Sequence, residues 1–458
     1  MPTQVNRVLE IVSLHKNQDY LHATEAAHRY LQQYPEDEVV LQILGDSAIQ
    51  SGNIDVGEKV MTLLLQWGRT ASRLQCMSTV RAAQGNLAEA ERLLQEALRV
   101  DPGHAGSWSA IANLRQFQPN DPLITKAKRA LRWSGQTDKQ RRAICYALCK
   151  AMNDLRKWDQ AWDYAAKGAA LAETSYNPDL FRDWLADVEA TFDAEFLEPL
   201  AGRGLSTNAP IFIVGMPRSG TTLMESILAA SDSVSPMGEM MTIAEFAQRA
   251  SQDDRARGNA PSAHGWVRRW NKDAFRRAGD HYLSMVAQRY GGNAPQHFSD
   301  KLPNNVLYLG QIGLIFPNAR IIRMHRNALD TCVSCYLGEL RNGHDYTYRT
   351  DWLADAALGY GRIGDYLSGM IPNPVLDVCY EDLVSQPEPQ IRRVLDFIGV
   401  EWNADCLEPA MFGYSTTTRS AAQVRGAINT NSVGRWRRYA NKIAPLADAL
   451  GVDLATAA

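Results

Sequence analysis

Residues 211–224 combine a cation, hydroxyl groups and glycines at a spacing that suits an anion. Four apolar residues, Ile211 to Val214, precede a turn bounded by Gly215 and Gly220, and an apolar helical pattern follows. Glycines let the backbone approach an anion closely, and the amides at the N-terminus of the helix then face its negative charge. This pattern predicts a site for a phosphate-like group, held by Arg218, Ser219, Gly220, Thr221, Thr222 and Leu223.

The loop departs at one position from the P-loop that binds nucleoside triphosphates. That motif places Lys directly after its second Gly, where the side chain contacts the terminal phosphates. Here the position is Thr221, and the cation, Arg218, lies inside the loop. The departure argues against a P-loop kinase or other NTPase, which stays the first alternative. A glycine-rich turn without a ligand is the other interpretation of this motif taken alone.

Arg326 and Ser334 indicate a second anion site. The run 320–325 is typical of a buried strand, and a helical pattern carrying Ser334 follows it. An Arg guanidinium donates two hydrogen bonds at once to phosphate oxygens. Since the helix folds back from the strand, the hydroxyl and the guanidinium are expected to reach one phosphate.

Four separated motifs, in the right order, resemble those of sulfotransferases that use 3′-phosphoadenosine 5′-phosphosulfate (PAPS). PRSGTT resembles their 5′-phosphosulfate loop, and the Arg326–Ser334 pair resembles their 3′-phosphate site. The Tyr-Glu-Asp-Leu turn at Tyr380 and the C-terminal stretch with Ser420 and Arg435 are similar to two later segments. The resemblance covers about residues 209–445. It implies PAPS as the donor, no metal, Tyr380 near the nucleotide, and Ser420 and Arg435 as phosphate contacts.

Helical repeats upstream of these motifs make the whole chain similar to the bacterial tetratricopeptide-sulfotransferase family. The nearest well-understood branch is the tyrosylprotein sulfotransferases. That branch has a further Arg four residues beyond the Ser, where this chain has Gly338. One phosphate contact of that branch is therefore missing or comes from another residue.

The resemblance also implies three catalytic residues. Arg218 and Lys301 are expected to stabilise the leaving group, because a protonated Lys binds oxygen rather than removing a proton. Glu239 is the expected base, since the tyrosylprotein branch carries its catalytic Glu in a Gly-Glu-Glu motif there, although only one carboxylate remains here. A surface glutamate that caps a helix is the alternative for Glu239. Three further residues are reserve bases, namely His297, His325 and Asp300.

The elements that position these residues fall into two parts. Up to about residue 197 the pattern is helical and repeats at roughly the tetratricopeptide period of 34 residues. In one unit the small residues Ala90 and Ala97 precede Pro102, and Trp108 leads the next unit. The stretch between about residues 119 and 140 fits the repeat poorly. From the loop onward, apolar runs typical of strands alternate with helices, which predicts a parallel sheet. The four runs are 211–214, 297–302, 320–325 and 375–380. We expect a tetratricopeptide-like helical domain at 1–198, a linker at 199–208 and an α/β sulfotransferase domain at 209–458.

Composition and charge give no sign of a nucleic-acid binder, a secreted protein or a membrane-spanning protein. The 458 residues carry a net charge of -3, which gives no sign of a nucleic-acid binder. We find no signal peptide and no apolar run long enough to span a bilayer. Seven scattered cysteines favour a reduced, cytoplasmic setting. Cys332 and Cys335 form a lone CxxC, best interpreted as two small apolar residues on one helix.

The sequence therefore predicts sulfuryl transfer from PAPS to a hydroxyl on a peptide tyrosine, a glycan or a lipid. The repeats either bind a protein partner or the acceptor, or they only support the enzyme. A non-catalytic repeat scaffold is the second alternative function. Oligomers are compatible with the sequence.

Overall fold

The computed structural model describes residues 4–17, 19–200, 202–259, 262–290, 292, 295–340, 343–409 and 427–456. Its contacts divide the chain into two compact units, Met1–Glu173 and Thr174–Ala458. Each unit buries hydrophobic clusters of its own.

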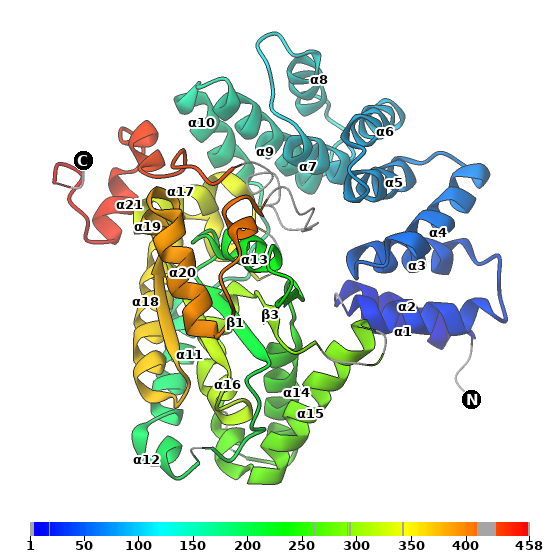
Figure 1. The fold of residues 1–458 in the computed structure, drawn as a ribbon. Helices are drawn as coiled ribbons and strands as arrows, with labels where there is room; N and C mark the ends of the chain where they lie inside the picture. Colours follow the sequence, from blue (N-terminus) through cyan, green and yellow to red (C-terminus); the bar gives the residue numbers. More distant parts are fainter. Residues whose placement is uncertain are drawn as a thin grey trace. The chain divides into compact units, whose positions relative to one another are not determined.

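The first unit is helical throughout its described part (Figure 1). Its helices are α1 (Gln4–Lys16), α2 (Tyr20–Leu31), α3 (Glu38–Gln50), α4 (Ile54–Trp67), α5 (Ala71–Ala83), α6 (Leu87–Val100), α7 (Ala105–Leu114), α8 (Pro122–Leu131), α9 (Asp138–Asp154) and α10 (Trp158–Ala169).

Small residues lie where paired helices of this unit cross. Ala90 and Ala97 of α6 are fully buried, as is Trp108 at the head of the next pair. A Cβ built on Gly168 of α10 would lie 2.9 Å from the ring of Tyr146 on α9, so only glycine allows this approach. Side chains of Asn53 and Asn86 cap α4 and α6 in the same way, one repeat apart. The predicted repeat architecture is thus confirmed.

The second unit contains one parallel five-stranded sheet with the order β2-β3-β1-β4-β5. Its strands are β1 (Pro210–Gly215), β2 (Ser235–Pro236), β3 (Phe298–Asp300), β4 (Arg320–His325) and β5 (Val375–Cys379). Sequence analysis predicted four of these strands and missed β2, whose two residues are too short to give a pattern.

Helices of the second unit cover both faces of its sheet. They are α11 (Pro178–Thr191), α12 (Ala194–Leu197), α13 (Thr221–Ala229), α14 (Thr242–Ala256), α15 (Lys272–Arg289), α16 (Leu309–Ile315), α17 (Ala328–Gly338), α18 (Thr350–Met370), α19 (Tyr380–Ser385), α20 (Pro387–Ile398) and α21 (Ala444–Ala449). Short 3-10 turns include η3 (Pro303–Tyr308), η4 (Asp345–Tyr348) and η7 (Arg435–Tyr439). The predicted α/β class of this domain is confirmed.

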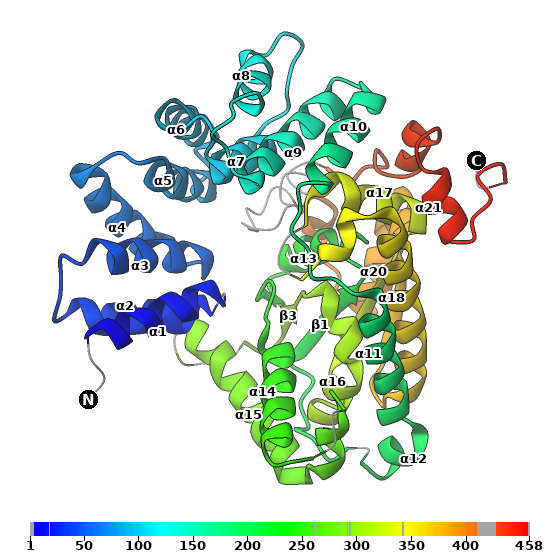
Figure 2. The ribbon, with the colours of Figure 1, turned by 180° about the vertical axis from the view of Figure 1, so that it is seen from behind.

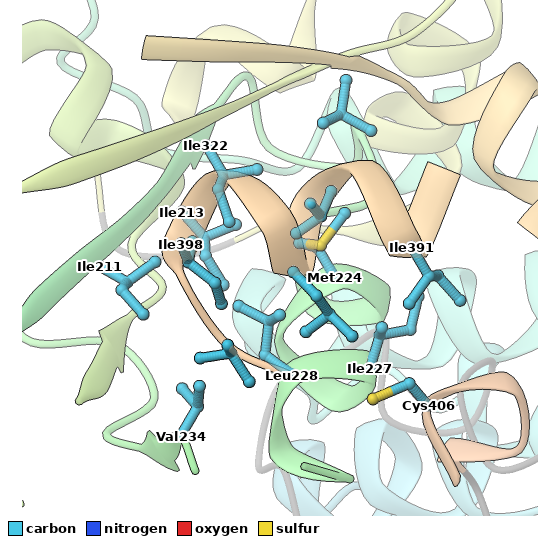
Figure 3. Packing of buried hydrophobic residues seen from close by; sticks show 14 of the residues in the cluster. Ile211, Ile213, Met224, Ile227, Leu228, Val234, Ile322, Ile391, Ile398 and Cys406 are labelled. Atoms are coloured by element: carbon cyan, nitrogen blue, oxygen red, sulfur yellow. The ribbon is translucent and has the colours of Figure 1, made fainter. Parts of the chain in front are cut away.

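Alternate residues of β1 anchor the two helical layers. Ile211 and Ile213 point into a buried cluster with Met224 of α13 and Ile391 of α20 (Figure 3). Phe212 points the other way, toward the rings of Tyr282 on α15 and Phe316 at the end of α16. Figure 2 shows α15, α16 and α18 from that second side. This packing fixes α13, and therefore the loop at its N-terminus, on the sheet.

α11 belongs to the second unit. The first unit therefore ends at Glu173, earlier in the chain than the domain end expected at residue 198. Arg182 of α11 forms an ion pair with Asp355 of α18 over 2.9 Å, and Tyr366 donates to the carbonyl of Glu189. Gly359 lets α18 approach α11 closely. No helix in the described part of the chain is long and apolar enough to cross a lipid bilayer.

Candidate active site

The loop between β1 and α13 forms a tight cradle. Gly215 and Gly220 both have positive φ, at 147° and 104°. A Cβ on Gly215 would lie 2.6 Å from the carbonyl oxygen of Met324, and one on Gly220 would lie 2.6 Å from the ring of Tyr380. Arg218 adopts φ 73°, a left-handed conformation that is costly for a residue with a side chain. The loop is thus held in one strained shape between β4 and α19.

Arg218, Ser334 and Arg326 come together although they are far apart in the sequence. Arg218 Nε donates to Ser334 Oγ over 3.0 Å. One terminal nitrogen of Arg326 donates to the carbonyl oxygen of Arg218 over 3.0 Å. The guanidinium also stacks over Tyr380, 4.6 Å from the ring centre. The two predicted anion sites are therefore parts of one cluster.

The C-terminal segment joins this cluster through Asp330. That carboxylate, buried in the first turn of α17, accepts the N–H groups of Gly434 and Trp436 over 2.7 and 2.8 Å. Arg326 donates to the carbonyl of Ser432 over 2.6 Å. Arg435 is therefore fixed between these anchor points. Ser420 lies outside the described residues.

Three buried donors of the cluster lack hydrogen-bond partners among the described residues. They are Ser219 Oγ, Arg326 Nε and Arg435 Nε. Buried polar atoms without partners are rare and call for an explanation. All three would be satisfied by phosphate oxygens, so the cradle fits a ligand that carries more than one phosphate group. Thr221 and Thr222 are buried in the first turn of α13, while Leu223 packs against the hydrophobic cluster.

Lys301 and Glu239 form a pair after β3 and β2. Lys301 is fully buried, and its Nζ donates to Glu239 Oε1 over 2.5 Å. The Glu239 side chain is 44% exposed, so its carboxylate is accessible to an acceptor. The cradle, Arg326, Tyr380, Lys301 and Glu239 all follow the carboxyl ends of parallel strands, where ligands of open α/β sheets bind.

Comparisons with known proteins find sulfotransferases among the similar sequences. Residues 210–404 match the model of a sulfotransferase family. An uncharacterized protein of Aquifex aeolicus is 28% identical over 389 residues, which are 82% of this chain and 50% of that protein. The chain thus spans half the length of this relative. A putative protein-tyrosine sulfotransferase of Caenorhabditis briggsae is 25% identical over 267 residues, 53% of this chain and 89% of that protein.

Among solved structures, the sulfotransferase domain from the Synechococcus PCC 7002 olefin synthase aligns with 55% of this chain and 97% of its own, at 22% identity and a TM-score of 0.36. The family match and the named relatives confirm the predicted resemblance. Residues 210–404 of the second unit are thus similar to a sulfotransferase family. The family-model match favours sulfuryl transfer over the P-loop kinase alternative.

Glu225 is a residue of the second unit that sequence analysis missed. It is fully buried on α13, and its Oε1 accepts the N–H of Gly238, the residue before Glu239, over 2.9 Å. Its other oxygen lies 3.9 Å from Lys301 Nζ. Glu225 therefore links the cradle helix to both members of the Lys301–Glu239 pair. The signal in the sequence that could have identified Glu225 is an acidic residue inside an apolar helical pattern.

The three reserve bases occupy other positions. Asp300 is fully buried and accepts from Tyr282 and Asn305 over 2.7 and 3.2 Å. Burial raises its pKa to about 7, a shift that the hydrogen bonds from Tyr282 and Met240 oppose. His325 binds Asp377 on the neighbouring strand over 2.7 Å. His297 precedes β3, at the opposite end of the strand from the cradle.

His344 is a titratable residue whose electrostatic neighbours include Glu239. It lies just before η4, and its Nδ1 shares a hydrogen bond with the Tyr346 hydroxyl over 2.9 Å. Burial lowers the pKa of His344, while the carboxylates of Glu239 and Asp345 act in the opposite direction. The residues before η4 carry no motif, so the fold alone shows that His344 lies within electrostatic reach of Glu239.

One thiol of the CxxC pair, that of Cys335, contacts the cradle loop. Cys332 and Cys335 are buried on α17, and both are free thiols. Burial raises the pKa of Cys335 to about 12, and its Sγ donates to the carbonyl of Pro217 in the loop over 3.4 Å. Across the part of the chain that the structure describes, no three His, Cys, Asp or Glu residues are grouped as metal ligands.

Proposed function

We propose that the second unit transfers the sulfuryl group of PAPS to a hydroxyl acceptor. The observation that carries this proposal is the convergence at one edge of the sheet. The cradle after β1, the Arg326–Ser334 pair after β4 and the Lys301–Glu239 pair after β3 follow three adjacent strands. An anion site thereby lies beside a carboxylate that an acceptor can reach.

The residues of the cradle would hold the two ends of the donor. Arg326, Ser334 and Arg435 suit the 3′-phosphate, because two of them bury a donor nitrogen without a partner among the described residues. The amides at the start of α13, with Arg218, suit the 5′-phosphosulfate end. Tyr380 closes the cradle beside Gly220. When bound, the donor supplies an electron-poor sulfuryl group next to a phosphate leaving group.

Glu239 and Lys301 have complementary roles in the proposed reaction. Glu239 takes the proton of the acceptor hydroxyl, and it is exposed enough for that contact. The buried ammonium of Lys301 orients the carboxylate and places positive charge near the leaving oxygen. Arg218 adds a second cation there. Positioning and charge stabilisation of this kind carry most of the catalysis in the related phosphoryl transfers.

The acceptor class is proposed from chemistry that lies beside Glu239. The imidazole of His344, which bonds the hydroxyl of the buried Tyr346, is a polar group near Glu239 that suits a phenol or a sugar. Relatives named protein-tyrosine sulfotransferases make a peptide tyrosine the first acceptor to test. A glycan or a lipid hydroxyl comes second. A cytoplasmic setting and a protein partner on the repeats remain parts of this proposal.

Transfer of label from [35S]PAPS tests the function. The full chain is incubated with tyrosine peptides, glycans and lipids in parallel, and Glu239→Gln and Glu388→Gln serve as the test and control variants. Glu388 lies on the solvent side of α20 and, among the described residues, forms its ion pair with Arg392 of the same helix. We expect label on one of the three acceptor classes. This labelling should be lost in Glu239→Gln and kept in Glu388→Gln. Donor binding without label on any class would favour the non-catalytic scaffold instead.

A further inference from the structure

A cavity of about 470 Å³ lies in the repeat unit, where the repeat is interrupted. After α7 the chain runs through residues 115–121 before α8 begins, and Asn120 adopts φ 64° within this connection. The cavity opens between the connection, the end of α6 and the start of α8. Its polar walls are Gln95, Arg99, Arg115, Gln118, Asn120, Asp121 and Lys126.

One of the three cations in this cavity is structural. Arg115 forms ion pairs with Glu91 and Asp121 over 2.5 Å each. Asp121 also caps α8 by accepting the N–H of Leu123 over 2.9 Å. Its side chain is 2% exposed. These bonds hold the connection and α8 in place, so the wall of the cavity is rigid.

The other two cations of the cavity are not neutralised. Arg99 and Lys126 form no ion pair within 4.0 Å among the described residues. Arg99 is exposed and Lys126 is half-buried, and the acidic neighbour of Arg99, Glu96, is itself paired with Arg69. Burial, and then the nearby guanidinium of Arg99, lower the pKa of Lys126. Two like charges held near each other in a recess repel, and a bound anion would remove that cost.

We propose that this cavity is a binding site for a tetrahedral dianion, either a free sulfate or phosphate ion or a phosphate monoester. Two unpaired cations match two negative charges. The Arg guanidinium and the side-chain amides of Gln95, Gln118 and Asn120 supply several N–H donors around one recess. This proposal rests on the repeat unit alone and does not depend on the sulfotransferase activity.

Calorimetric titration of the full chain with sodium sulfate tests the proposal. Ionic strength is held constant with sodium chloride, and excess 3′-phosphoadenosine 5′-phosphate is added to occupy the cradle of the second unit. We expect one sulfate per chain, and roughly tenfold or greater weakening in Arg99→Gln and in Lys126→Gln. Lys128→Gln, on the exposed side of α8, is the matched control and should bind as the parent does.

Further ligands identify the source of the anion. Phosphate should bind as sulfate does, and acetate, a monoanion, more weakly. Phenyl phosphate binding at least as well as inorganic phosphate assigns a monoester, and weaker binding assigns the free ion. The proposal is overturned if sulfate gives no binding heat, or if its binding is unchanged in both glutamine variants. Removing one of two repelling charges does not threaten folding, and an unchanged melting temperature verifies this.

Discussion

Lys301 Nζ lies 2.5 Å from Glu239 Oε1, and the lysine is fully buried while the carboxylate is half-exposed. A buried ammonium is tolerated only when it is paired. The pair therefore fixes Glu239 at the surface of the site, and Glu225, 3.9 Å from the same nitrogen, supports it from within α13.

We expect Lys301 and Glu239 to act as one unit in the reaction. Glu239→Gln should lower kcat by about two to four orders of magnitude, as loss of a positioned base does. Lys301→Met should have a similar effect, because the carboxylate loses its orientation. The double variant should be no slower than the slower single variant. Single-turnover rates with labelled PAPS measure this, and losses that multiply would show that the two residues act independently.

Gly220→Ala should disrupt the cradle. A Cβ there would lie 2.6 Å from the Tyr380 ring, on a residue with φ 104°. We expect a loss of about 1–3 kcal/mol in the free energy of unfolding and a weaker affinity for nucleotide. Urea unfolding and calorimetry measure the two effects. Gly361→Ala in α18, where a Cβ meets open space, is the control and should be neutral or stabilising. Equal behaviour of the two variants would contradict the strained geometry.

Asp330 should matter for binding as well as for folding. Asp330→Ala leaves two N–H groups, of Gly434 and Trp436, without their buried acceptor, at about 1–3 kcal/mol each. Since Arg435 lies between them, nucleotide affinity should fall as well. Asp330→Asn keeps an acceptor and should lose less stability. Limited proteolysis of residues 427–456 reports the release of this segment, and a protease pattern unchanged in Asp330→Ala would rule out the anchoring role.

The sequence predicted the parts of the site that are local in the chain. The cradle, Arg326 with Ser334, and Tyr380 each belong to a strand-turn-helix unit whose pattern is visible within about twenty residues. Glu225, Asp330 and His344 were missed because their roles depend on partners in other elements. Likewise, the poor fit of residues 119–140 to the repeat was visible, but the cavity beside Lys126 depends on where α6 ends.

Asp300 should give the fold a pH dependence. Because folding raises the pKa of this buried carboxyl from 3.8 to about 7, the folded state holds a proton that the unfolded chain has released at intermediate pH. Its stabilising contribution is complete below the unfolded pKa and is lost as the pH rises through about 7. Asp300→Asn keeps the acceptor for Tyr282 and should remove this pH-dependent contribution to the free energy of unfolding.

The measurement for Asp300 is the free energy of unfolding from about pH 5 to about pH 8. The stability of the parent relative to Asp300→Asn should fall as the pH rises from about 5 to about 7, and should level off above that. Asp396→Asn, on the exposed side of α20, is the control and should give a constant difference. A constant difference for Asp300→Asn as well would show that Asp300 is already ionised in the fold.

The central claim is that the cluster of Arg218, Ser334 and Arg326 binds a 3′-phosphorylated nucleotide. Its most direct test is calorimetric titration with 3′-phosphoadenosine 5′-phosphate, with AMP and ATP as controls. We predict binding that requires the 3′-phosphate and weakens about 10- to 100-fold in Arg326→Ala, but not in Arg393→Ala on the surface of α20. Equal affinity for AMP, or unchanged affinity in Arg326→Ala, would contradict the claim and remove the basis for PAPS as the donor.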